Sequence, residues 1–249
     1  MTEFENKLKS KIISELEIAE KIYNDVRADL LEKSVTFSRL DESVQETKIP
    51  GFKLIKSGKG EVGDFIAFVL DIRNSTQNLT QSISSKVSKA SQLERVYYET
   101  TAINTCGIEL INKYDGGITE FLGDGFLALF PAKEKKDVHK AHNAAKDYIR
   151  YLKTVVNPII NERYNLPELK VGIGLAYGKA IVTLIGNNED VHPKAIGECV
   201  FRASKLSNGI NEILIDDKLR FFWPKSDDGT LKFSKINVKN QTFKGYKII

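Results

Sequence analysis

Residues 65–76 read FIAFVLDIRNST, and residues 116–130 read GGITEFLGDGFLALF. Each stretch is an apolar, strand-like run that meets an aspartate, Asp71 in the first and Asp124 in the Gly-Asp-Gly turn of the second. Burying an unpaired carboxylate costs several kcal/mol, so we expect both aspartates where strands reach the surface. Two carboxylates at the rim of one sheet suit hard divalent cations and a phosphate-bearing substrate.

Length and composition limit the classes of protein that fit. The chain has 249 residues, enough to bury a full core, and its hydrophobic fraction of 41% is ordinary for a soluble protein. No apolar run approaches the roughly 18 residues of a membrane span, and we see no signal-peptide leader, so we expect a cytoplasmic protein without a membrane partner. The net charge of +4 does not argue for a nucleic-acid partner. Cys106 and Cys199 fit no metal or redox spacing, which favours reduced thiols.

The N-terminal 34 residues are expected to form one long helix, because apolar residues recur at helical spacing without an intervening Gly or Pro. This helix either packs on its own domain or embraces a second protomer. Residues 35–60 contain proline and glycine breakers and are expected to be a connector with a short strand around 52–55. We therefore divide the chain into residues 1–60, the helix and connector, and residues 61–249, the main domain with its C-terminal strands.

The main domain alternates strand-like and helix-like patterns, which predicts an α+β fold with a mostly antiparallel sheet covered by helices on one face. His139 and His142 are expected on the surface of a polar helix, and Trp223 in the packing of the tail. The expected elements are a strand at 65–71, helices at 75–83 and 91–114, a hairpin at 117–130, a helix from 135 to 151 or onward to 163, a hairpin at 169–185 turning at Tyr177-Gly178-Lys179, a helix at 197–208, and strands at 213–215, 219–222, 231–238 and 243–249.

A family resemblance rests on four stretches: the two quoted above, LKVGIGLAYGKAIVTLIG at 169–186 and AIGECVFRASKL at 195–206. Together they resemble the class III nucleotidyl cyclase domain from about Phe65 to Ser207. The resemblance implies a ferredoxin-like palm, two divalent cations (Mn²⁺ or Mg²⁺) per site, and a nucleoside triphosphate substrate. It also implies a homodimer with two interface sites, where one protomer supplies metal ligands and the other supplies base-selecting residues.

The metal ligands implied by this resemblance are Asp71, Asp124 and the backbone carbonyl of Ile72. In the family, one ion activates the ribose 3′-hydroxyl and the other grips the triphosphate. The structural alternative is that Asp71 caps a helix and Asp124 only makes a turn.

Phosphate binding is expected at the backbone of the helix start that contains Asn74, Ser75 and Thr76. The family usually has Gly then Phe where this chain has Asn74 and Ser75. Ser and Thr are also ordinary helix N-caps, so these side chains could be purely structural.

Glu120 and Lys194 are the expected base-selecting pair. Adenylate cyclases carry a lysine and an aspartate at these two places, so the charges are reversed here. A glutamate needs an N–H donor from the base and a lysine needs a carbonyl. Uracil, guanine and cytosine can each provide them, and the pair therefore argues against ATP without choosing among the other three. The structural alternative is two solvated surface charges.

Pocket size and phosphate contacts involve the helix at 197–208. Purine-using relatives carry Asn and, four residues later, Arg, where this chain has Phe201 and Lys205. An aromatic side chain there would shrink the pocket and favour a pyrimidine, unless Phe201 is an ordinary core residue. Lys205 keeps a positive charge without the bidentate geometry of Arg, and Arg202 could share its catalytic work. Lys179 occupies a position where some relatives carry a phosphate-binding Arg.

These departures resemble the bacterial pyrimidine cyclases of anti-phage Pycsar systems. The resemblance implies conversion of UTP to 3′,5′-cyclic UMP, with CTP as the close second, and a product that acts as a second messenger after phage infection. A guanylate cyclase would share Glu120 but is disfavoured by Phe201 and by Lys194, where those enzymes usually carry Cys. A non-catalytic nucleotide-binding relative is favoured by loss of the Asn/Arg pair and disfavoured by the two aspartates.

Overall fold

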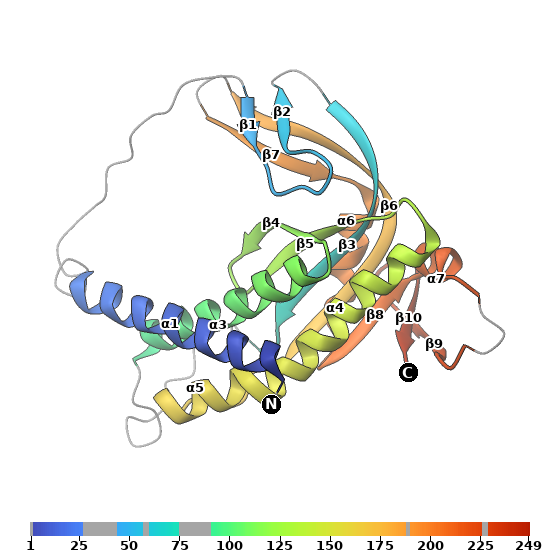
Figure 1. Ribbon diagram of the computed structural model, residues 1–249. Helices are drawn as coiled ribbons and strands as arrows, with labels where there is room; N and C mark the ends of the chain where they lie inside the picture. Colours follow the sequence, from blue (N-terminus) through green and yellow to red (C-terminus); the bar gives the residue numbers. More distant parts are fainter. Residues whose placement is uncertain (1, 27–43, 57–59, 75–90, 188–189, 226–228) are drawn as a thin grey trace.

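The computed structural model describes residues 2–26, 44–56, 60–74, 91–187, 190–225 and 229–249 (Figure 1). Its centre is an eight-stranded sheet with the order β4-β5-β3-β6-β8-β10-β9, and β7 pairs with β6. Among the strand pairs that the structure describes, only β6–β8 is parallel, so the expected α+β fold with a mostly antiparallel sheet is confirmed. The strands are β3 (Gly60–Ile72), β4 (Gly117–Leu122), β5 (Gly125–Pro131), β6 (Val171–Asn187), β7 (Asp190–Ile196), β8 (Glu212–Asp216), β9 (Phe233–Asn237) and β10 (Lys244–Ile248).

Four helices cover one face of this sheet (Figure 1). They are α1 (Glu3–Val26), α3 (Gln92–Lys113), α4 (Val138–Tyr151) and α5 (Asn157–Tyr164), with a π-helical turn at Leu152–Val156 joining the last two. Ser91 starts α3 with a capping box, in which its side chain and that of Glu94 bond each other's backbone N–H. The helix expected at 75–83 lies outside the described residues.

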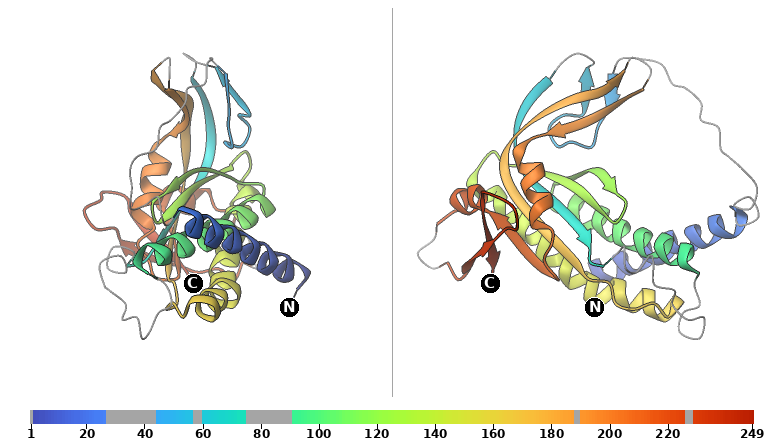
Figure 2. Two further views of the ribbon diagram at one scale, coloured as in Figure 1. Left: turned by 90° about the vertical axis from the view of Figure 1, so that its left-hand side faces the viewer. Right: turned by 180° about the vertical axis from the view of Figure 1, so that it is seen from behind.

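The opposite face of the sheet is also covered, which corrects the expectation of a single covered face. Helix α6 (Glu198–Leu206) lies on it (Figure 2), and Phe65, Ala67 and Val69 of β3 are buried there, whereas Ile66, Phe68 and Leu70 face the long helices. A strand buried on both faces is continuously apolar, as residues 65–70 are. A Cβ on Gly174 would lie 2.0 Å from the carbonyl oxygen of Ala203, so glycine permits this close packing of α6 on β6.

The connector and the N-terminal helix both pack on this domain. Strands β1 (Val44–Glu46) and β2 (Leu54–Lys56) form a separate antiparallel pair, so the expected short strand exists but begins two residues later and ends one residue later. Leu8, Ile12 and Leu16 of α1 are fully buried in the same core as the sheet, so the helix packs on its own domain. Within the described residues, no helix is long and apolar enough to cross a membrane.

Two expected elements are wrong. Residues 169–185 do not form a hairpin, because β6 continues through Tyr177-Gly178-Lys179 while paired with Ile66, Phe65 and Asp64 of β3, which is itself 13 residues long. Residues 219–222 are not a strand but part of α7 (Asp217–Phe222), which begins when the Asp216 carboxylate accepts a 2.8 Å hydrogen bond from the backbone N–H of Leu219. Asp, Asn, Ser and Thr side chains commonly cap the N-terminus of a helix by accepting such a hydrogen bond.

His142 is buried rather than exposed. It faces Trp223 edge-on, with ring centroids 5.2 Å apart, and burial lowers the pKa of its imidazole to about 4. Trp223 is itself buried, which confirms its role in the packing of the tail.

Candidate active site

The two aspartates lie at the same end of neighbouring strands. Asp71 pairs with Gly125 of β5 and with Gly172 of β6, and the backbone N–H of Ile72 donates a 2.9 Å hydrogen bond to the carbonyl oxygen of Asp124. A Cβ at Gly125 would lie 1.9 Å from the carbonyl oxygen of Leu70, so a glycine is required for this approach of the turn to β3. Both carboxylates are partly exposed at the rim of the sheet, as the sequence predicts.

Arg73 is the cation that meets these aspartates in the structure. Its guanidinium forms an ion pair with Asp71, and the charge of Asp124 also acts on it, opposing the burial that lowers the pKa of the guanidinium. Its backbone N–H is fixed by a 2.7 Å hydrogen bond to the carbonyl oxygen of Lys170. Nε is buried and has no hydrogen-bond partner among the described residues. Two carboxylates that draw in a half-buried guanidinium form a cation-binding environment.

The donor set fits a hard divalent cation with few protein ligands. Among the described residues, no group of three or more His, Cys, Asp or Glu side chains could hold a metal. Asp71 and Asp124 with one backbone carbonyl are the number of protein ligands that Mg²⁺ commonly uses when substrate phosphates and water complete its octahedron. Arg73 has to leave Asp71 for an ion to bind there.

Asn74 adopts φ = +61°, in the left-handed region. Relatives with glycine at this place can reach that conformation freely, and Asn is among the side chains that tolerate it best. The substitution thus keeps the backbone turn after β3. Ser75 and Thr76 lie outside the described residues.

Glu120 and Lys194 are brought together, with the ammonium 2.6 Å from the carboxylate. Glu120 comes from β4 and Lys194 from β7, and Figure 1 shows β7 above β4, where the curled end of β6 carries it. Their side chains are 24% and 37% exposed. The two are therefore a partly buried ion pair rather than two separately solvated charges.

Helix α6 presents Phe201 and Lys205 to solvent. Phe201 is 51% exposed, so the alternative that it is an ordinary core residue is wrong. The Lys205 ammonium lies 5.4 Å from the centroid of the Phe201 ring, within the range of a cation–π contact. The aromatic ring and the cation thus form one surface of α6.

Arg202 points elsewhere on the same helix. Its guanidinium contacts the carboxylates of Glu198, Asp216 and Asp217 at 2.6 to 3.2 Å, and it is only 12% exposed. Asp216 is fully buried, and burial raises its pKa to about 6 against the opposing hydrogen bonds and the Arg202 charge. These contacts tie α6 to α7, a structural use of Arg202 that the sequence did not indicate.

Lys179 lies in mid-strand, because the hairpin turn expected there does not exist. Its ammonium is 2.9 Å from the carboxylate of Asp64, which lies opposite it on β3. Asp64 and Asp71 are seven residues apart on β3, so Lys179 lies about 23 Å along the strand from the aspartate pair of its own chain. Within one chain, the structure does not bring Lys179 to that pair.

One residue of this site was missed by the sequence analysis. We assigned no role to Arg73 from the sequence. The available signal was a lone basic residue two positions after Asp71, the aspartate that ends the uncharged run at 65–70.

The structure has the fold of the class III nucleotidyl cyclase catalytic domain. It superposes on the guanylyl cyclase Cya2 with a TM-score of 0.62 and 19% identity, over 76% of this chain and 93% of that one. For the adenylyl cyclase CyaB from P. aeruginosa the TM-score is 0.60 with 18% identity, over 77% and 96% of the two chains. At this level of identity the likeness establishes the fold.

The sequence comparison is more local. A stretch of 90 residues is 31% identical to the terminal-differentiation specific adenylate cyclase of Dictyostelium discoideum. It covers 36% of this chain and only 4% of that protein. No model of a known protein family matches the sequence.

Proposed function

We propose that this chain is a nucleotidyl cyclase that converts UTP to 3′,5′-cyclic UMP and diphosphate, with CTP as the second candidate substrate. The observation that carries the proposal is the pair of aspartates, Asp71 and Asp124, at one strand end of a class III cyclase fold. The reversed charges of Glu120 and Lys194 and the aromatic Phe201 support a pyrimidine base.

In the reaction, the ribose 3′-oxygen attacks the α-phosphorus, the bond from that phosphorus to the bridging oxygen breaks, and diphosphate leaves. The 3′-hydroxyl proton passes to solvent. Asp71, Asp124 and the Ile72 carbonyl would hold two divalent cations, Mn²⁺ or Mg²⁺, which supply electrostatic stabilisation to the attacking and leaving oxygens. Lys205 would add positive charge near the phosphates, and the backbone of residues 74–76 would donate N–H groups to them.

Base selection falls to the ion pair. The Glu120 carboxylate would accept the N3–H of uracil, and the Lys194 ammonium would donate to a flanking carbonyl oxygen. In the free protein, the Glu120 carboxylate and the Lys194 ammonium pair with each other. A bound base would replace this one contact with two hydrogen bonds, one to each side chain. Phe201 would limit the space to one ring.

The complete site would form between two copies of the chain. Phe201 and Lys205 are exposed in one copy, as residues that serve a second protomer have to be. One protomer would supply Asp71 and Asp124, and the other Glu120, Lys194, Phe201 and Lys205. A homodimer then has two equivalent sites. By the Pycsar resemblance, the product would be a cytoplasmic second messenger in anti-phage defence.

A guanylate cyclase is the second candidate function, because guanine offers N1–H to Glu120 and O6 to Lys194. It requires room for a two-ring base beside Phe201. The size of that side chain is the feature that favours UTP over GTP.

The test is incubation of the purified protein with Mn²⁺ and equal ATP, GTP, CTP and UTP, with cyclic products identified by mass. Cyclic UMP or cyclic CMP alone supports the proposal. Cyclic GMP or cyclic AMP would retain the cyclase and overturn the base assignment.

Asp71→Ala and Asp124→Ala should each lower turnover by about 10²-fold or more, the range for loss of one transition-state electrostatic contact. The matched control is Asp115→Ala, an exposed turn aspartate paired with Lys140, which should leave turnover unchanged. Unchanged turnover in either site variant would overturn the site.

A further inference from the structure

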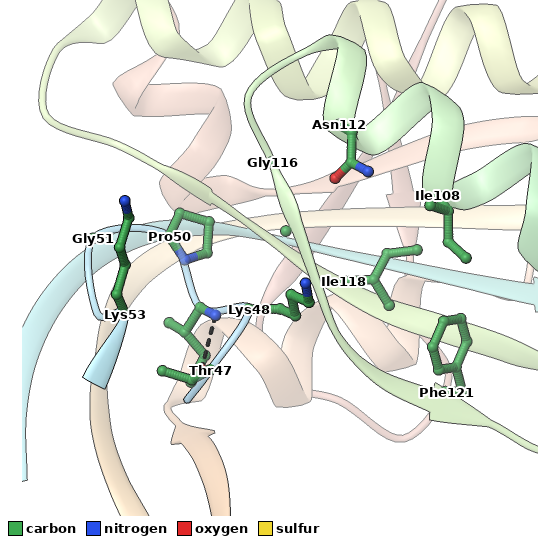
Figure 3. Close-up of a pocket in the computed structure, with 12 residues that line it drawn as sticks. Thr47, Lys48, Pro50, Gly51, Lys53, Ile108, Asn112, Gly116, Ile118 and Phe121 are labelled. Atoms are coloured by element: carbon green, nitrogen blue, oxygen red, sulfur yellow. Dashed lines mark hydrogen bonds between the residues drawn. The ribbon is translucent and has the colours of Figure 1, made fainter. Parts of the chain in front are cut away.

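A cavity of about 560 Å³ lies between the connector loop at residues 47–53, α3 and β4 (Figure 3). This volume is within the range of small-molecule sites. None of Asp71, Asp124, Phe201 and Lys205 lines it, so it is separate from the proposed nucleotide site.

Its walls are mainly apolar. Ile49 of the loop is buried. Ile108 of α3 and Phe121 of β4 are 38% and 56% exposed, and Ile118 lies between them (Figure 3). Partly exposed large apolar side chains that converge on a hollow mark a place where an apolar group can be buried.

The polar groups of the cavity are donors and cations. Lys48 extends from the loop toward Ile118, and Asn112 projects from α3 on the opposite side of the cavity (Figure 3). Lys53 lies at the outer end of the same loop. Neither lysine forms an ion pair with any residue that the structure describes, and no Asp or Glu lines the cavity. The Lys48 ammonium beside the apolar wall, with Lys53 adding positive charge farther out on the loop, favours an anion.

The loop that carries the lysines is fixed before any ligand arrives. The backbone N–H of Thr47 donates to the Lys53 carbonyl at 3.1 Å, that of Phe52 to the Ile49 carbonyl at 3.0 Å, and that of Ile49 to the Thr47 hydroxyl at 2.9 Å. A Cβ on Gly117 would lie 2.0 Å from the Lys48 carbonyl oxygen, so the loop packs directly against β4. A preorganised wall lowers the ordering cost of binding.

We propose that this cavity binds a small organic anion, a carboxylate, sulfonate or phosphate on an aromatic or branched apolar body. The anionic group lies at Lys48, and the body lies against Ile108, Ile118 and Phe121. Ile118 and Phe121 flank Glu120 on β4, so the ligand contacts the strand that carries the base-selecting carboxylate.

The test uses 1-anilinonaphthalene-8-sulfonate, an aromatic sulfonate whose fluorescence rises in apolar surroundings, titrated into the full chain without nucleotide or metal. We expect saturable binding of one probe per chain. Lys48→Glu should weaken it at least tenfold through charge repulsion, and Ile108→Trp should weaken it similarly by filling the cavity. Lys153→Glu, which reverses an exposed lysine outside the cavity, should bind like the parent protein.

Equal affinity in all three variants would place the probe elsewhere and overturn the proposal, as would the absence of saturable binding to the parent protein. Unchanged melting temperature and circular dichroism in Ile108→Trp show that loss of binding is not loss of folding, and Lys48→Glu gives an independent readout on an exposed side chain. Because no nucleotide is present, this result does not depend on whether the chain is a cyclase.

Discussion

The Lys194 ammonium lies 2.6 Å from the Glu120 carboxylate, although three strands separate β7 from β4 in the hydrogen-bonded order of the sheet. The contact is possible because β6 is long enough to curl and to bring β7 back over β4 (Figure 1). The sequence separation of the two residues gives no hint of this closeness. Under the proposed function, this ion pair would offer one acceptor and one donor to the base.

Exchanging the two charges should change the preferred base. The double variant Glu120→Lys, Lys194→Asp restores an ion pair of opposite polarity, so its stability should stay within about 1 kcal/mol of the parent. Its preference for UTP over ATP, measured as the ratio of kcat/KM values, should fall by about 100-fold or more, because sites built for one hydrogen-bond pattern reject another. Glu120→Asp with Lys194→Arg is the control that keeps the polarity, and a double exchange that leaves the ratio unchanged would remove the pair from base selection.

Enlarging the pocket should admit purines. Phe201→Asn removes an exposed ring from α6 and should reduce discrimination against GTP by about tenfold, with little effect on folding because the side chain is half exposed. The measurement is the ratio of kcat/KM for UTP and GTP. Phe221→Asn, at a position that is 89% exposed on α7, is the matched control. If both variants discriminate like the parent, the size argument is wrong.

Removing Arg73 should tighten metal binding. The guanidinium competes with a divalent ion for Asp71, so Arg73→Ala should strengthen Mn²⁺ binding by about tenfold, equivalent to about 1.4 kcal/mol. Free Mn²⁺ followed by electron paramagnetic resonance measures this without any turnover. Arg150→Ala, which breaks the surface pair with Asp147, should bind Mn²⁺ like the parent. Weaker binding in Arg73→Ala would mean that the arginine organises the site instead of competing for it.

His142 should make the protein less stable in mild acid. The pKa of its imidazole is about 4 in the folded state and 6.5 as its ordinary value, so the unfolded chain binds more protons between these limits. Its contribution is full above pH 6.5 and is lost as the pH falls toward 4. Between pH 7 and pH 5 this amounts to about 2 kcal/mol.

Urea unfolding of His142→Leu at pH 7 and pH 5 isolates this contribution. The buried Asp216, whose raised pKa of about 6 acts in the opposite direction, is present in both proteins and cancels in the difference. His139→Leu, an exposed histidine on the same helix, should keep the pH dependence of the parent. A His142→Leu variant with the parent's pH dependence would contradict the assignment.

Local sequence signals were sufficient for most of the elements and for the aspartate pair. Apolar runs that stop at a charge predict where strands surface, and both Asp71 and Asp124 lie at such ends. The signals failed where distant partners decide the local structure. Gly178 suggests a turn in isolation, yet the pairing of Phe65 with it keeps β6 extended.

The candidate site was less predictable than the fold for the same reason. The contact of Glu120 with Lys194 depends on the curl of the sheet, and the burial of His142 depends on Trp223, which is far away in sequence. Arg73 lies next to a predicted ligand, but only the three-dimensional arrangement places its guanidinium on the carboxylate.

Helix α1 has a practical consequence for making this protein. Leu8, Ile12 and Leu16 are almost wholly removed from water by the same core that supports the sheet, and burial of each such side chain is worth roughly 1.5–3 kcal/mol. Their sum is comparable to the net stability of an ordinary domain. An expression fragment trimmed to residues 61–249 would expose the apolar residues of α3 that α1 covers and should aggregate, so biochemical work has to retain the helix.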